Sequence, residues 1–156
     1  MPILFFKNNI LAQKYYKLLN NDITDALTNF NKKYEKFPIK ALGRVSRASY
    51  FKNVKNLSVN GVSMESNILI REIKNRYNDL KKKSKKSYFS FILRSFLKDA
   101  SMCKSEQEIK NLYPHYKKEM DAEIKQMNLD LNFCIEGLKE VTKSLHQYNI
   151  ENNETR

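Results

Sequence analysis

The residues that could act as nucleophiles or general bases are few in this sequence. His115 and His146 stand in neither a His-Glu-x-x-His motif nor a Cys/His pattern typical of zinc sites. Cys103 precedes Lys104, whose charge would lower the pKa of the thiol. No defined catalytic partner accompanies Cys103, and Cys134 falls on an apolar helical face. We therefore interpret both cysteines as structural.

Carboxylates one helical turn apart could in principle bridge a metal ion. Glu119 with Glu123, and Glu136 with Glu140, have this spacing. No Glu-x-x-His motif accompanies either pair, as helical two-metal sites require, so a solvated helix face explains them better. The three glycines form neither a phosphate-cradling loop nor a dinucleotide fingerprint. We predict a protein that is not an enzyme and uses no metal or cofactor.

The positive signal is a concentration of basic side chains. The 156-residue chain has a net charge of +12, and residues 31–98 carry 18 Lys and Arg against 4 Asp and Glu. Residues 99–156 carry 8 against 11. Clustered cations bind phosphates and release counterions, and aromatic rings between them can stack on open bases. The predicted nucleic-acid-binding residues are Arg44, Arg47, Tyr50, Lys52, Lys55, Lys81, Lys82, Lys83, Lys85 and Lys86.

The basic excess has other interpretations. Lys, Asn, Ile, Tyr and Phe are abundant, whereas Arg occurs only six times, a bias that an AT-rich genome produces without selection for binding. The run at 81–86 could simply be a solvated helix end, where the helix dipole favours cations. A third interpretation is peripheral binding to an anionic membrane through the apolar, basic N-terminal helix and the lysine run.

Residues 37–52 carry a local resemblance to a known family. They read Phe-Pro-Ile-Lys-Ala-Leu-Gly-Arg-Val-Ser-Arg-Ala-Ser-Tyr-Phe-Lys. This stretch resembles the helix-turn-helix region near the start of IS3-type transposases, and residues 67–74 are similar to the next segment of that family. The resemblance, over about residues 37–98, implies DNA binding through Arg47, Tyr50 and Lys52. It implies no transposition chemistry, because the rest of the chain has no acidic catalytic triad.

The elements that position these residues are predicted to be helices. Apolar residues recur every three or four positions over residues 3–19, and Asn20-Asn21-Asp22 predicts a break before a second helix that Pro38 ends. Ser46 could cap a short helix that carries residues 50–57. Residues 58–61 read as a turn. Val59-Asn60-Gly61-Val62 is also a hairpin signal, although the flanking strands are too short to stand alone.

The second half of the chain also has helical spacing. A helix is predicted from Ser63 into the lysine run, and Ser87 could cap a short helix. Ser105 and Glu108 fit a capping box for another short helix. Pro114 suits the first turn of a last helix, where its missing N–H has no cost.

The last helix has the clearest regularity. A heptad pattern, with steps of four and three residues, links nine positions. Leu129, Phe133 and Ile135 widen the apolar surface beyond a two-stranded seam, and positions e and g offer no opposite charges. We therefore favour a long helix at about 114–148, packed in its own bundle, over a parallel dimer. The nine positions are Met120, Ile124, Met127, Leu131, Cys134, Leu138, Val141, Leu145 and Tyr148.

The fold expected from these elements is an all-α, single-domain bundle of five or six helices over residues 1–150, with a frayed tail at 151–156. Nucleic-acid binding through the basic part, residues 31–98, is the leading functional prediction. The alternative is a protein-interaction module that uses the heptad face, such as an inhibitor, an immunity protein, a chaperone-like subunit or a secreted effector. The choice between DNA and RNA and the oligomeric state stay open.

Two cysteines do not make a disulfide framework, which favours a reduced setting. The N-terminus has no basic stretch before its four-residue apolar run, unlike a secretory signal peptide. We therefore predict a cytoplasmic protein, with export without a cleaved signal as the alternative.

Overall fold

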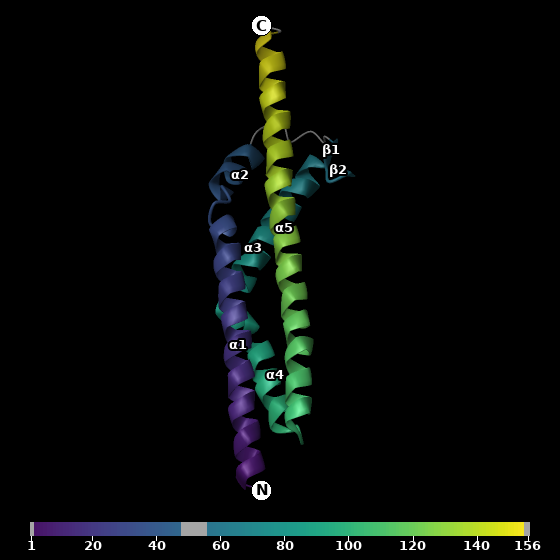
Figure 1. Ribbon diagram of the computed structural model, residues 1–156. Helices are drawn as coiled ribbons and strands as arrows, with labels where there is room; N and C mark the ends of the chain where they lie inside the picture. Colours follow the sequence, from purple (N-terminus) through teal and green to yellow (C-terminus); the bar gives the residue numbers. More distant parts are fainter. Residues whose placement is uncertain (1, 48–55, 155–156) are drawn as a thin grey trace. The chain divides into compact units, whose positions relative to one another are not determined.

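A computed structural model describes residues 2–47 and 56–154, with side chains from residue 9 to residue 151 (Figure 1). Five α-helices, a short 3₁₀ helix and one hairpin make up the described residues, which confirms the all-α prediction. In chain order they are α1 (Pro2–Tyr34), α2 (Ile39–Ser46), β1 (Asn56–Val59), β2 (Val62–Glu65), α3 (Ser66–Lys83), η2 (Lys86–Phe89), α4 (Ser90–Ser101) and α5 (Glu106–Glu154).

The contacts divide the chain into two units. Unit 1 comprises residues 1–32 and 82–127, and unit 2 comprises residues 33–81 and 128–156. Unit 1 therefore contains most of α1, together with η2, α4 and the first part of α5. Unit 2 contains α2, the hairpin, nearly all of α3 and the second part of α5. The single domain over residues 1–150 stays a prediction.

The predicted break at Asn20–Asp22 is wrong, because α1 continues through these residues. Leu19 and Ile23 are fully buried on either side of them, so the apolar face is continuous across the polar residues. The Thr24 hydroxyl donates to the Asn20 carbonyl at 2.9 Å, a bond within the helix. Pro38 lies just beyond the end of α1, as predicted.

Between Pro38 and α3, two predictions need correction. Ser46 ends α2 rather than starting a helix, and its hydroxyl donates to the Gly43 carbonyl at 2.9 Å. Leu57 lies in β1, not in a helix. The hairpin forms because Asn60 and Gly61 both adopt positive φ, 52° and 81°, as a tight Asn-Gly turn requires. The strands pair in register from 56↔65 to 59↔62, and α3 starts after them, at Ser66 rather than Ser63.

Unit 1 has an aromatic core and a helix cap. Phe96 of α4 meets the ring of Tyr116 edge-on at 5.7 Å, and the Tyr116 hydroxyl donates to Asp99. The Ser105 hydroxyl accepts the Glu108 N–H at 3.2 Å, as the capping box predicts. The Glu108 carboxylate, however, accepts the N–H of Lys104 at 2.8 Å. Pro114 lies inside one continuous helix, so the predicted helix boundary there is wrong.

Unit 2 has its core where α3 packs against α5. Gly137 permits this close approach, because a Cβ at that position would lie 2.8 Å from Ile73 Cδ1 and 3.3 Å from Leu69 Cδ1. Ile73 and Leu69 are both fully buried. The ring of Tyr77 stacks on Tyr34 at 4.9 Å, which adds the end of α1 to this core.

The heptad positions of α5 form part of the chain's own core. Six of the nine are buried: Met120, Met127, Leu131, Cys134, Leu138 and Val141. Ile124, Leu145 and Tyr148 are half-buried. The helix is longer than the predicted 114–148, and residues 151–154 continue it instead of forming a separate tail.

No helix within the described residues is both long enough and apolar enough to cross a membrane.

Candidate polyanion-binding surface

Three exposed cations lie on one face of α2. Lys40, Arg44 and Arg47 are spaced by four and three residues, so they project from the same side of the helix and its C-terminal cap. Leu42, on another face, is fully buried and anchors α2 in unit 2. The packing of α2 therefore turns its cations toward solvent.

The exposed face of α3 continues the basic character. Arg71, Lys74 and Lys81 are exposed at helical spacing, while Ile73 and Leu80 are fully buried on another face. The three cations span ten residues, which corresponds to about 15 Å along a helix. They form a row, not a single point of charge.

A contact joins the two helices. The Lys74 ammonium donates to the Ser46 hydroxyl at 3.5 Å, which brings the C-terminal end of α2 against α3. A small groove of about 250 Å³ lies there, lined by Ser46, Asn67, Ile70, Arg71 and Lys74. The contact places Lys74 at the end of α2 that carries Arg44 and Arg47. We call this region the α2–α3 basic surface, defined by Lys40, Arg44, Arg47, Arg71, Lys74 and Lys81.

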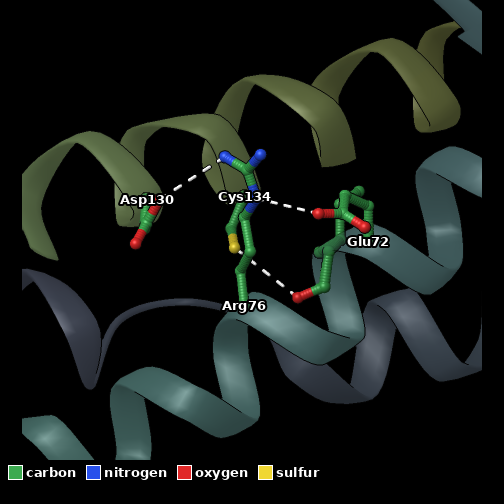
Figure 2. Close-up of polar contacts among 5 residues, drawn as sticks. Glu72, Arg76, Asp130 and Cys134 are labelled. Carbon is green, nitrogen blue, oxygen red and sulfur yellow. Dashed lines mark hydrogen bonds and ion pairs between the residues drawn. The ribbon is translucent and has the colours of Figure 1, made fainter. Parts of the chain in front are cut away.

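Two carboxylates, Glu72 of α3 and Asp130 of α5, interact with a different arginine. Arg76 donates to Glu72 at 3.3 Å and to Asp130 at 3.5 Å, as Figure 2 shows. Its guanidinium also lies 3.9 Å from the centroid of the Phe133 ring, a cation–π contact. Arg76 is therefore a packing residue between α3 and α5.

The thiols are poor candidates for chemistry. Cys134 is fully buried, and its Sγ donates to the Ile73 carbonyl at 3.6 Å (Figure 2). Burial raises the pKa of Cys134 to about 12, although Arg76 acts in the opposite direction. Burial, followed by Glu108 and Asp99, also raises the pKa of Cys103. The shift is therefore opposite to the lowering expected from Lys104.

The lysine run is divided between the two units and is partly neutralised. Lys81 belongs to unit 2, whereas residues 82–86 belong to unit 1. Lys83 lies 3.5 Å from the Glu123 carboxylate, which also accepts the Tyr88 hydroxyl at 2.8 Å. The remaining lysines of the run in unit 1 are exposed: Lys82, Lys85 and Lys86.

Part of the predicted site lies outside the described residues. Tyr50, Lys52 and Lys55 fall in the interval 48–55 between α2 and β1. The helix-turn-helix geometry that the transposase resemblance implies therefore stays a prediction. Arg44 and Arg47 are placed, on α2 and at its end.

The sequence interpretation missed Lys40, Arg71 and Lys74. A signal for the last two was present: Asn67, Arg71, Lys74, Asn78 and Lys81 recur every three or four residues on the polar face of the predicted helix. The run at 81–86 is the stronger local signal because its lysines are adjacent in the sequence, whereas Arg71 and Lys74 share a face only once a helix is assumed.

Among the residues whose positions are described, no group of three His, Cys, Asp or Glu could hold a metal ion. The chain matches no protein-family model, no curated protein and no solved structure.

Proposed function

We propose that this protein binds nucleic acid through the α2–α3 basic surface. The observation that carries the proposal is the contact between Lys74 and Ser46, because it brings a cation of α3 to the end of α2 that carries Arg44 and Arg47. The acidic neighbours Glu72 and Asp130 interact with Arg76, which lies elsewhere on α3. The surface can therefore offer several cations to a row of phosphates.

Binding of this kind is electrostatic and largely independent of sequence. Each Lys or Arg that neutralises a phosphate releases a condensed counterion, which supplies the driving force. The amide of Asn67 lines the groove beside the cations and can donate to a phosphate oxygen. This neutral donor would help to orient the phosphate backbone along α3.

The test is a salt titration of affinity for a fluorescent DNA duplex and for an RNA duplex of the same sequence. If all six cations contact phosphates, the slope of log Kobs against log salt is about −5. Replacing two of them, in an Arg71→Gln/Lys74→Gln variant, should reduce the slope by about 2 and weaken binding about tenfold or more at low salt.

A matched control removes the same charge elsewhere. Lys118 and Lys125 are exposed residues of α5 in unit 1, and a Lys118→Gln/Lys125→Gln variant should bind with nearly unchanged slope. Equal slopes and affinities for wild type and the Arg71→Gln/Lys74→Gln variant would refute the proposed site. Comparison of the two duplexes decides whether DNA or RNA is preferred.

A further inference from the structure

Unit 2 contains an apolar groove that the basic surface does not use. The groove has a volume of about 680 Å³. One wall comes from Phe37, Pro38 and Ala41 at the start of α2, and the other comes from the second part of α5. Its size is within the range of ligand and peptide sites, and its lining is mostly carbon.

The α5 wall is a second helical seam. Ile135, Leu138 and Thr142 line the groove at spacings of three and four residues. Leu138 also belongs to the buried heptad face, whereas Ile135 is half-buried and Thr142 is exposed. A helix that is placed along such a seam could insert its own side chains every three or four residues, as in helix-in-groove recognition.

Two cationic side chains line the same wall. Lys139 and Lys143 border the groove four residues apart, and His146 follows three residues later. The groove residues of α5 run from 135 to 146, about 16 Å along the helix axis. Lys139 contacts Glu136 at 3.3 Å, but its side chain is 67% exposed. An exposed pair of this kind contributes little, so Lys139 can change partners at low cost.

The distribution of charge indicates the shape of the occupant. A fatty acid carries one carboxylate at one end and would need its cations gathered at one end of the groove. Lys139 and Lys143 instead lie within the wall, between Leu138 and His146. Cations beside an apolar seam match a helix with an apolar stripe and flanking Asp or Glu, as at the flanks of a coiled coil.

We propose that this groove binds an amphipathic helix of a partner protein, with acidic residues along the flank that faces Lys139 and Lys143. This inference is independent of the proposed nucleic-acid binding, because the lining residues of the groove are not part of the α2–α3 basic surface.

The test uses two fluorescein-labelled model peptides, each about 18 residues long so that a helix can form on binding. In both peptides Leu recurs at alternating spacings of three and four residues. One peptide carries Glu along one flank of this apolar stripe, and the other carries Lys at the same positions. Anisotropy titrations with the full-length protein should give a Kd for the Glu peptide that is at least tenfold lower than that for the Lys peptide.

A charge exchange locates the binding. The Lys143→Glu variant should lose preference for the Glu peptide and gain affinity for the Lys peptide. Lys125 is an exposed lysine on α5 outside the groove, and a Lys125→Glu variant should leave the preference unchanged. Circular dichroism of both variants checks that the helices remain intact.

Three outcomes would overturn the proposal. The first is equal affinity for both peptides, or the same preference in the Lys143→Glu variant as in wild type. The second is tight binding of laurate with no binding of either peptide, which would assign the groove to a fatty carboxylate. The third is self-association in sedimentation that a Thr142→Arg variant abolishes, which would assign the groove to a second copy of the chain.

Discussion

Arg71 and Arg76 lie on the same helix, but their surroundings differ. Arg71 is exposed and lines the small groove beside Ser46. Arg76 interacts with Glu72, Asp130 and the Phe133 ring, and the Asp130 side chain is only 18% exposed. We expect Arg76→Ala to lower the free energy of unfolding by about 1–3 kcal/mol, because a partly buried carboxylate loses its guanidinium.

Urea unfolding monitored by circular dichroism measures this effect, and Arg71→Ala is the matched control. Because Arg71 is a surface residue, its loss should change stability by no more than about 0.5 kcal/mol. Equal destabilisation by the two substitutions would contradict the packing role of Arg76.

The surroundings of Cys134 predict a slowly reacting thiol. Its pKa of about 12 keeps the thiol protonated, so only about one molecule in 10⁴ carries a thiolate at pH 8, against about a quarter for an ordinary cysteine. In a Cys103→Ser variant, the remaining thiol should react with an aromatic disulfide reagent at least about 10³-fold more slowly in the folded protein than in urea. Fast labelling of the folded protein would show that Cys134 is accessible.

At the scale of elements, Gly137 determines how closely α3 can approach α5. A Cβ there would lie 2.8 Å from Cδ1 and 3.1 Å from Cγ1 of Ile73. Alanine gains about 1 kcal/mol in helix propensity, but overpacking a core costs about 1–3 kcal/mol. We expect Gly137→Ala to destabilise the protein by about 1 kcal/mol, as measured by chemical denaturation.

A double-mutant cycle separates the two effects. Ile73→Val removes Cδ1, the nearest of the clashing atoms, so Gly137→Ala should be neutral or stabilising in that background. If Gly137→Ala destabilises both backgrounds equally, the close approach of α3 to α5 is not the reason for the glycine.

The sequence predicted helices well and boundaries less well, for identifiable reasons. The polar triplet Asn20–Asp22 has the composition of a cap, yet Leu19 and Ile23 bury the same face of one helix. Pro114 has the properties of a first-turn residue, but α5 continues through it. Tertiary burial decides the first case, and it is not visible in local composition.

The hairpin turn, by contrast, was predictable from local sequence. Asn60-Gly61 is a strong local turn signal, and the two positive φ angles confirm it. What the sequence did not show is that Val59, only 2% exposed, anchors the short strands. A two-stranded ribbon is marginal in isolation and needs such packing.

The candidate site was only partly predictable for a related reason. Arg44 and Arg47 belong to a dense basic segment and were found from charge alone. Arg71 and Lys74 join them through the contact between Lys74 and Ser46, which connects residues 28 positions apart. A contact of that range depends on how α2 and α3 pack, and no spacing rule supplies it.

The exposed cations behind the net charge of +12 are divided between the two units of the molecule. The exposed lysines at 82, 85 and 86 belong to unit 1, whereas the α2–α3 basic surface belongs to unit 2. A charge excess due only to base composition would make every exposed cation equivalent. A binding site would instead make the cations of one region contribute more to nucleic-acid affinity than the other cations.

Two variants with the same net charge test this difference. The first replaces Arg44, Arg71 and Lys74 with Gln in unit 2, and the second replaces Lys82, Lys85 and Lys86 with Gln in unit 1. Each loses three charges and keeps the other region intact. We expect the unit 2 variant to reduce the salt slope of duplex binding by about 3 and the unit 1 variant to reduce it by less than about 1. Equal reductions would indicate that affinity depends on net charge, and a larger loss in the unit 1 variant would move the site to the lysine run.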